Sequence, residues 1–214
     1  MSSSGASVGA YVRLLAILVA VAALSSPVWA QPAETSARAL FEAGQYEQAI
    51  RAVAQDRQRG VNEPADTYLS AQSYERLGQP DRAKAEFALL DNLKDAAWRL
   101  VGDSAESLID ADVEQALKAA TQAAASAPEF FFAQYQLGLV KAERQDWAGA
   151  ADAFERATQI DPTFAYAHYY AGLTYSKVKR ADRTATHFEV FLKLAPKAPE
   201  RAAVESIMRT LRGR

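Results

Sequence analysis

Few side chains in this sequence belong to the types that usually carry out chemistry. The chain has no cysteine, which excludes thiol catalysis, thiolate metal sites and disulfides. Its two histidines, His168 and His187, lie 19 residues apart and form no metal-binding motif. The sequence also lacks a Gly-x-Ser-x-Gly elbow, a phosphate-binding loop and a dinucleotide fingerprint. We therefore expect no catalytic residues, no metal and no cofactor, and we interpret both histidines as structural.

One small acidic group, Asp110, Asp112 and Glu114, has the oxygen atoms that a calcium ion prefers. The segment lacks the glycine and the length of a calcium-binding loop, so a solvated turn is the better interpretation. The net charge of −2 contains no basic excess, which argues against nucleic acid as a partner.

The elements that position these side chains are expected to be helices. Alanine makes up about a fifth of the 214 residues, and the chain has only 10 glycines and 8 prolines, a composition that favours helix. A period of 34 residues separates Pro128, Pro162 and Pro196. The same period separates five further pairs: Gly138 and Gly172, Phe154 and Phe188, Ala116 and Ala150, Gly44 and Gly78, and Ala49 and Ala83. Such a period is typical of stacked helical repeats.

Each period is interpreted as two helices joined by a turn. In residues 131–162, the turn at Asp146 separates a first helix from a second, and Pro162 ends the second. Gly138 and Ala150 are small, which predicts that the two helices cross closely at these positions. A packing role for the glycines is therefore favoured over phosphate binding.

These features resemble the tetratricopeptide repeat (TPR) family. Residues 131–164 match the family pattern at Leu137, Gly138, Trp147, Ala150, Phe154, Ala157 and Pro162. Residues 165–198 match it at Gly172, Tyr175, Phe188 and Pro196. The resemblance implies an all-α fold, a right-handed α-solenoid of about five helix-turn-helix units with a C-terminal capping helix.

The units are expected at 31–63, 64–94, 95–130, 131–164 and 165–198. The third unit carries a two-residue insertion, and the boundary near 88–97 is irregular because the second unit is short and lacks its proline. Residues 199–214 place Val204, Ile207, Met208 and Leu211 on one face of a helix, which suits the capping helix that a repeat array needs.

In this family the first helices of the units line a concave face that usually binds protein segments. The resemblance carries the groove positions to Phe132, Tyr135, Leu139, Tyr166, Tyr169, Leu173, Lys177, Tyr68 and Arg99, and also to Gln72, Glu75, Arg76, Asp103, Glu106, Ala142, Glu143 and Ser176. Exposed tyrosines suit a peptide or helix ligand. The alternative is that these aromatic rings pack between helices. Clamps for a C-terminal carboxylate use Lys or Arg where this chain has Tyr135 and Tyr169, so no such clamp is expected.

The first thirty residues are interpreted as an export signal. Arg13 precedes an apolar run at 14–24, which as a helix would rise about 16 Å, roughly half of a bilayer's hydrocarbon core. Short residues before Gln31 suit cleavage by a signal peptidase after Ala30. We therefore expect a periplasmic protein without stable membrane insertion after cleavage. A retained membrane anchor is the alternative.

Together these patterns predict a non-enzymatic periplasmic adaptor or scaffold. It would hold a peptide or helix of an envelope protein in the TPR groove and aid assembly of an envelope complex. The main alternative is a structural subunit that forms homo-oligomers through its repeat ends. Sugar binding by the tyrosines is a third alternative.

Overall fold

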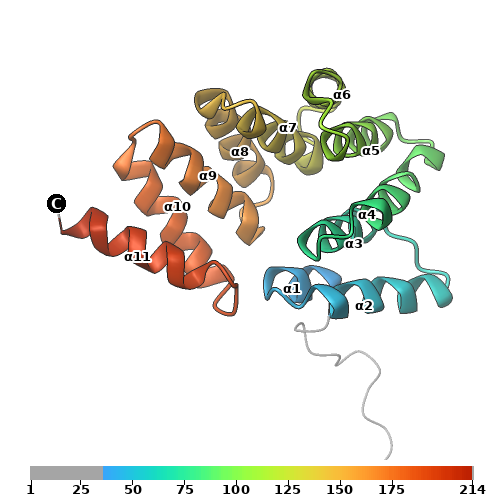
Figure 1. Cartoon of the computed structure of the whole chain (residues 1–214), viewed down its shortest axis with the longest axis horizontal. Helices are drawn as coiled ribbons and strands as arrows, with labels where there is room; N and C mark the ends of the chain where they lie inside the picture. Colours follow the sequence, from blue (N-terminus) through green and yellow to red (C-terminus); the bar gives the residue numbers. More distant parts are fainter. Residues whose placement is uncertain (1–35, 214) are drawn as a thin grey trace, which may run out of the picture. The chain divides into compact units, whose positions relative to one another are not determined.

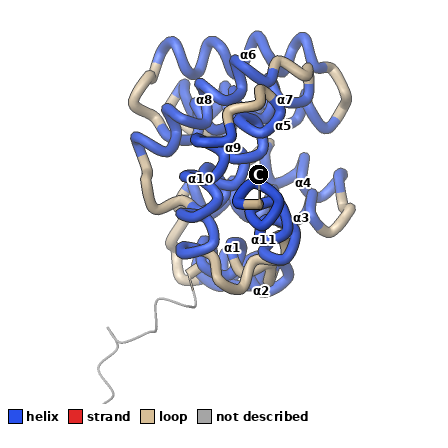
Figure 2. Tube along the Cα trace, turned by 90° about the vertical axis from the view of Figure 1, so that its left-hand side faces the viewer, coloured by secondary structure: helices blue, strands red, loops and turns tan. Residues whose placement is uncertain are grey.

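The computed structural model describes residues 36–213, which fall within one compact unit, Glu34–Arg214. The expected signal peptide at 1–30 lies outside the described residues. From residue 36 to residue 213 the chain forms helices joined by short turns and contains no strand (Figure 1). In Figure 2 the short loops, drawn in tan, connect helices that stack side by side. The predicted all-α fold class is confirmed.

The helices follow one another in pairs. The pairs are α1 (Ala37–Glu42) with α2 (Tyr46–Gln58), α3 (Pro64–Arg76) with α4 (Pro80–Phe87), α5 (Ala96–Ile109) with α6 (Val113–Ser126), α7 (Phe131–Glu143) with α8 (Trp147–Ile160), and α9 (Ala165–Lys177) with α10 (Ala181–Leu194). The last helix, α11 (Arg201–Arg212), stands alone, and a short 3-10 helix, η2 (Leu90–Asn92), separates α4 from α5. Across residues 36–213 every helix is too short or too polar to cross a bilayer.

Each pair turns back on itself at a residue with positive φ. These residues are Gly44 (73°), Gly78 (67°), Ala111 (59°), Gln145 (61°) and Lys179 (61°). A left-handed residue is the usual way to end one helix and reverse the chain, and glycine adopts it without a Cβ clash. The first two pairs have glycine at this point, whereas the last three hold a residue with a side chain in a conformation that costs about 1 kcal/mol.

The close crossing within the later pairs confirms the packing role of the glycines. A Cβ on Gly138 would lie 2.7 Å from the ring of Phe154, and a Cβ on Gly172 would lie 2.5 Å from the ring of Phe188. Both rings are fully buried. The 34-residue period thus repeats one contact, in which a phenylalanine ring of the second helix packs against a glycine of the first.

Aromatic side chains and a buried hydrogen-bonded chain fill the core between the pairs. The Tyr68 hydroxyl donates to Oε1 of Gln136 (2.7 Å), and Nε2 of Gln136 donates to the Ser104 hydroxyl (3.3 Å). The Ser104 hydroxyl donates in turn to the carbonyl of Ala116 (2.9 Å). These bonds connect α3, α7, α5 and α6, and they satisfy polar groups that would otherwise be buried at a cost.

The first pair also meets the last helices of the same unit. Nη1 of Arg38 on α1 lies 2.8 Å from Oδ2 of Asp161, which precedes α9. Oε1 of Glu42 accepts from the backbone N–H of Ala165, the first residue of α9 (2.9 Å). Gly44 lies against Pro199, just before α11. We call these contacts the seam, and Figure 1 draws α1, in blue, beside the start of α11, in red.

Candidate protein-binding pocket

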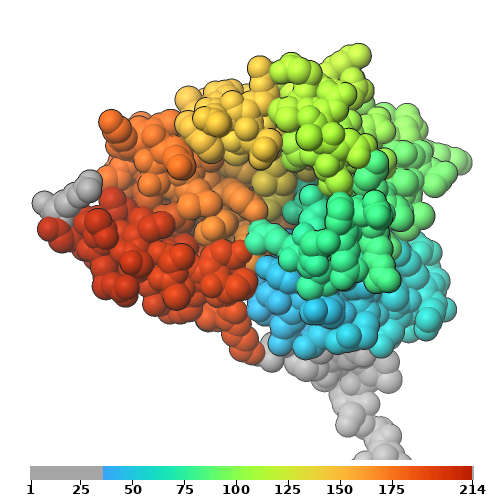
Figure 3. All heavy atoms as spheres, viewed as in Figure 1, coloured from blue at the N-terminus to red at the C-terminus, as the bar shows by residue number. Residues whose placement is uncertain are grey.

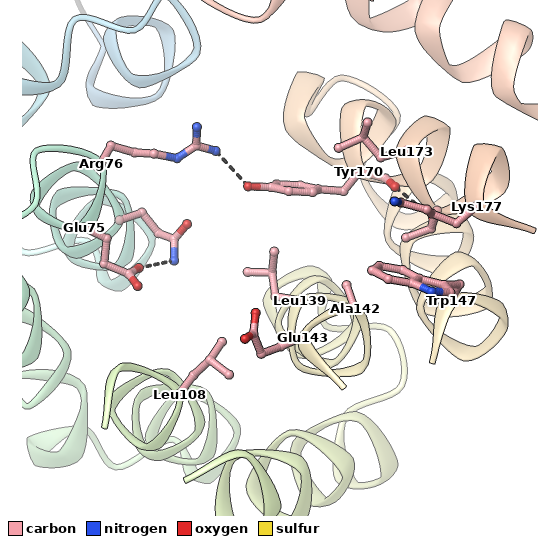
Figure 4. Close-up of a pocket in the computed structure, with 12 residues that line it drawn as sticks. Glu75, Arg76, Leu108, Leu139, Ala142, Glu143, Trp147, Tyr170, Leu173 and Lys177 are labelled. Carbon is pink, nitrogen blue, oxygen red and sulfur yellow. Dashed lines mark hydrogen bonds between the residues drawn. The ribbon is translucent and has the colours of Figure 1, made fainter. Parts of the chain in front are cut away.

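A pocket of about 500 Å³ opens on the inner face of the helix array. Side chains from α3, α5, α7 and α9 surround it, together with Trp147 at the start of α8 (Figure 4). The apolar lining consists of Leu108, Leu139, Ala142, Trp147, Tyr170 and Leu173. The polar lining consists of Gln72, Glu75, Arg76, Glu143, Thr174 and Lys177. The space-filling view shows this face hollowed between α3, in green, and α9, in orange (Figure 3).

One side of the pocket is acidic. Oε2 of Glu75 accepts a hydrogen bond from Nε2 of Gln72 (2.7 Å). Burial raises the pKa of Glu75 to about 7, although the neighbouring Arg76 acts in the opposite direction. Glu143 is exposed and faces the same opening from α7 (Figure 4). Two carboxyl groups from different helices therefore border one end of the pocket.

The two cations of the pocket are held by other groups. Nη1 of Arg76 lies 2.8 Å from Oε1 of Glu200, and Nη2 donates to the Tyr170 hydroxyl (2.8 Å). Nζ of Lys177 lies 5.3 Å from the ring centroid of Trp147, a cation–π contact at the opposite end from Glu75. Arg76 is thus part of the wall, and it joins the pocket to the segment that begins α11.

The apolar floor comes from equivalent positions of successive repeats. Leu139 of α7 and Leu173 of α9 are 34 residues apart, and both are half-buried. Half-buried leucines on a concave face leave apolar area that a bound side chain can cover, and a pocket with a few placed polar groups is the usual form of a binding site.

Eight of the predicted groove residues line this pocket: Gln72, Glu75, Arg76, Leu139, Ala142, Glu143, Leu173 and Lys177. Arg99 is exposed and donates to the carbonyl of Leu93 (3.0 Å), outside the pocket lining. Phe132 is half-buried, and its ring lies 4.8 Å from that of Trp98. The role of Arg99 and Phe132 in partner binding stays a prediction.

The expectation of exposed tyrosines is wrong for three residues. Tyr68 and Tyr166 are 0% exposed and Tyr135 is 1% exposed. The ring of Tyr135 stacks on Phe131 at 5.6 Å between centroids and meets the edges of Phe154 and Phe164. These rings fill the space between adjacent first helices, so packing was the correct alternative for them. Tyr169 is half-buried against Phe191, with ring centroids 5.2 Å apart.

Leu108, Trp147, Tyr170 and Thr174 line the pocket although they were not among the predicted groove positions. The two-residue insertion in the third repeat shifts its positions relative to the family pattern, so the pattern does not assign Leu108 to the groove. Trp147 belongs to a second helix, and its place follows from the contact with Lys177 in the next repeat.

The two histidines form a separate polar cluster between α8, α9 and α10. Their Nδ1 atoms lie 3.1 Å apart, Nε2 of His168 lies 3.1 Å from the carbonyl of Pro162, and Nε2 of His187 lies 2.9 Å from Glu155. Burial lowers the pKa of His168. Both rings are buried, and within residues 36–213 no group of three acidic or histidine side chains is arranged to hold a metal.

Comparison with known proteins agrees with the fold. Residues 138–178 match the family model described as TPR repeat. A thermophilic TPR protein of Thermus thermophilus, TTC0263, is similar over 82% of this chain and 94% of its own, with 18% identity and a TM-score of 0.59. The APC/C hetero-tetramer Cut9-Hcn1 is similar over 84% of this chain and 37% of its own, with 15% identity and a TM-score of 0.57. No curated protein matches the sequence.

The described chain is therefore an α-solenoid of paired helices with the fold of TPR proteins. Residues 138–178 match the TPR repeat model, and the neighbours share the fold of the described chain. Repeats of this family mediate protein–protein interaction, and the fold is generally a non-catalytic scaffold.

Proposed function

We propose that this protein is a non-catalytic adaptor whose pocket holds a segment of another protein. The observation that carries the proposal is the pocket itself, where half-buried leucines of two repeats lie between carboxyl groups and a lysine. Apolar area flanked by charges supplies affinity and orientation to an extended or helical segment.

The proposal includes a location and a context. The N-terminal pattern of Arg13, the apolar run at 14–24 and Ala30 supports export to the periplasm, where the adaptor would aid assembly of an envelope complex. Mass spectrometry of the protein from a periplasmic extract should find Gln31 as the first residue. An intact N-terminus in the membrane fraction would favour the retained anchor instead.

Photo-crosslinking in cells tests the adaptor directly. A photoreactive residue replaces Glu143 or Lys177, both exposed at the pocket, and in the control it replaces Asp152, which is exposed on α8 and outside the pocket lining. The adaptor predicts a discrete adduct with another protein from the two pocket probes and none from the control. Adducts only between copies of this chain would favour the self-associating structural subunit. No adduct from any probe in the folded protein would contradict binding in this pocket.

A further inference from the structure

We propose that the segment bound in the pocket places a lysine or arginine side chain between Glu75 and Glu143, next to an apolar side chain on Leu108 and Leu139. This inference rests on the proposed function and specifies the chemistry of the partner. Figure 4 shows the two carboxyl groups bordering the same opening, with Leu108 below it.

The first argument is that neither carboxyl group forms an ion pair with a cation within residues 36–213. The neutral amide of Gln72 is the hydrogen-bond partner of Glu75. Arg76 weakens the effect of burial on Glu75, but its guanidinium is bound to Glu200 and to Tyr170. A largely buried carboxylate without a paired cation is unfavourable. A partner that supplies the cation therefore gains binding free energy from an ion pair that the free protein lacks.

The second argument is the position of the pocket's own cation. Lys177 lies over Trp147, at the end opposite Glu75 (Figure 4). Its charge repels a basic side chain at that end and favours one at the acidic end. The bound segment therefore has one orientation, with its basic residue toward α3 and α7 and its neutral or acidic part toward α9.

The third argument is the apolar surface beside the carboxyl groups. Leu108 and Leu139 are half-buried and lie at the pocket. The methylene stem of a lysine or arginine covers such surface while its charged end reaches a carboxylate. A neighbouring apolar side chain covers the rest, so the motif is a basic residue adjacent to a large apolar one.

Binding of this kind must depend on pH. In the free protein the pKa of Glu75 is about 7 because the carboxyl group is buried. A cation beside it lowers this pKa, so binding releases a proton and the affinity rises with pH. If the pKa of Glu75 in the complex returns to the ordinary range of a glutamate, the peptide should bind about tenfold more weakly at pH 6 than at pH 8.

The experiment begins with a library of displayed random twelve-residue peptides, from which those that bind the full chain at pH 8 are selected. A selected peptide and its copy with norleucine in place of lysine are then labelled, and their affinities are measured by fluorescence anisotropy at pH 6 and pH 8. The variant Glu75→Gln keeps the hydrogen bond to Gln72 and removes the charge. Glu47→Gln, on the exposed surface of α2, is the matched control.

We expect selected peptides to share a basic residue beside an apolar one. Norleucine should weaken binding at least tenfold, and Glu75→Gln should abolish the pH dependence, which Glu47→Gln should keep. Selected peptides that bind in the pocket but are not enriched in lysine or arginine would overturn this inference. The proposal that the protein is an adaptor would then still stand. Selection of acidic motifs would also overturn it. A failure to select any pocket-binding peptide would contradict the adaptor together with the inference.

Discussion

Glu75 is expected to destabilise the free protein at neutral pH. Its pKa of about 7 in the fold lies above the ordinary value of 4.5, because burial disfavours the charged form. The stability that this group contributes is complete below about pH 4.5 and is lost as the pH rises through 7. Glu75→Gln should therefore raise the free energy of unfolding at pH 8 by up to about 3 kcal/mol and change it little at pH 4.5.

Urea unfolding of the wild type, Glu75→Gln and Glu47→Gln at both pH values measures this difference. Glu47 is exposed, so its substitution should leave stability unchanged at either pH. An equal effect of Glu75→Gln at pH 4.5 and pH 8 would show that the carboxyl group is not held neutral by burial. A residue that lowers stability where the protein works is consistent with a binding role.

Individual pocket residues were predictable from the repeat register only in part. The register gives the direction of a side chain from its helix, and it placed eight side chains of α3, α7 and α9 at the pocket, among them Leu139, Leu173 and Lys177. It does not give the distance to the next helix. For Tyr68 and Tyr135 that distance is small, with ring centroids 6.4 Å apart, so these rings are buried where a groove surface was expected.

At the scale of the helix pair, the turn residues offer a test in both directions. Ala111 holds positive φ (59°) with a methyl group, whereas Gly78 holds it (67°) without one, and a Cβ on Gly78 would meet nothing within 4 Å. Ala111→Gly should stabilise the protein by about 0.5 kcal/mol, and Gly78→Ala should destabilise it by about 1 kcal/mol. Urea unfolding measures both, and shifts of the same sign would contradict a conformational cause.

The crossing of α7 and α8 predicts that Gly138→Leu is far more damaging than Gly149→Ala. A Cβ at Gly138 meets the buried ring of Phe154, so leucine should cost about 3 kcal/mol or more. Gly149 lies away from the crossing, but its Cβ would displace the carboxylate of Asp146, which caps α8. Loss of that cap costs about 1 kcal/mol and is partly offset by the helix propensity of alanine. Equal melting temperatures would refute this register.

Helix pairs were predictable because the 34-residue period repeats the same local contacts, such as phenylalanine against glycine. The irregular point was also visible in the sequence. Where the second repeat lacks its closing proline, α4 ends at Phe87 and the chain continues through the 3-10 helix η2 to Leu93. The form of that irregularity was not predictable, because no repeated contact specifies it.

At the scale of the whole described unit, the seam is the feature that the sequence does not reveal. Arg38 and Asp161 are 123 residues apart, a separation unrelated to the repeat period. Their contact depends on the curvature accumulated over the first four helix pairs, α1 to α8. Glu42 also supplies a hydrogen-bond acceptor to the first N–H of α9, which its own N-cap residue, Phe164, does not cap with a side chain. The seam thus satisfies a helix terminus across the array.

Removal of the seam contacts should loosen the first helix pair. Arg38→Ala deletes the ion pair to Asp161 and the cation–π contact 4.8 Å above the ring of Phe164, and it leaves Glu42 without its cation. Because these groups are half-buried, we expect a loss of about 1–2 kcal/mol and faster hydrogen exchange in α1 and α2. The exposed pair of Arg180 and Asp182 is the control, and Arg180→Ala should leave the free energy of unfolding nearly unchanged.

Because Arg76 joins the pocket to Glu200 next to α11, the seam and the pocket belong to one network of contacts. Weakening the packing of the first helix pair should therefore also destabilise α3, which forms one wall of the pocket. In hydrogen-exchange measurements, Arg38→Ala should raise exchange in α1 and α2 most, in α3 less, and in α6 not at all. Exchange confined to the first turn of α1 would mean that the ends of the array only touch. Exchange that spreads to α3 would mean that the contact between the two ends of the array stiffens the pocket wall.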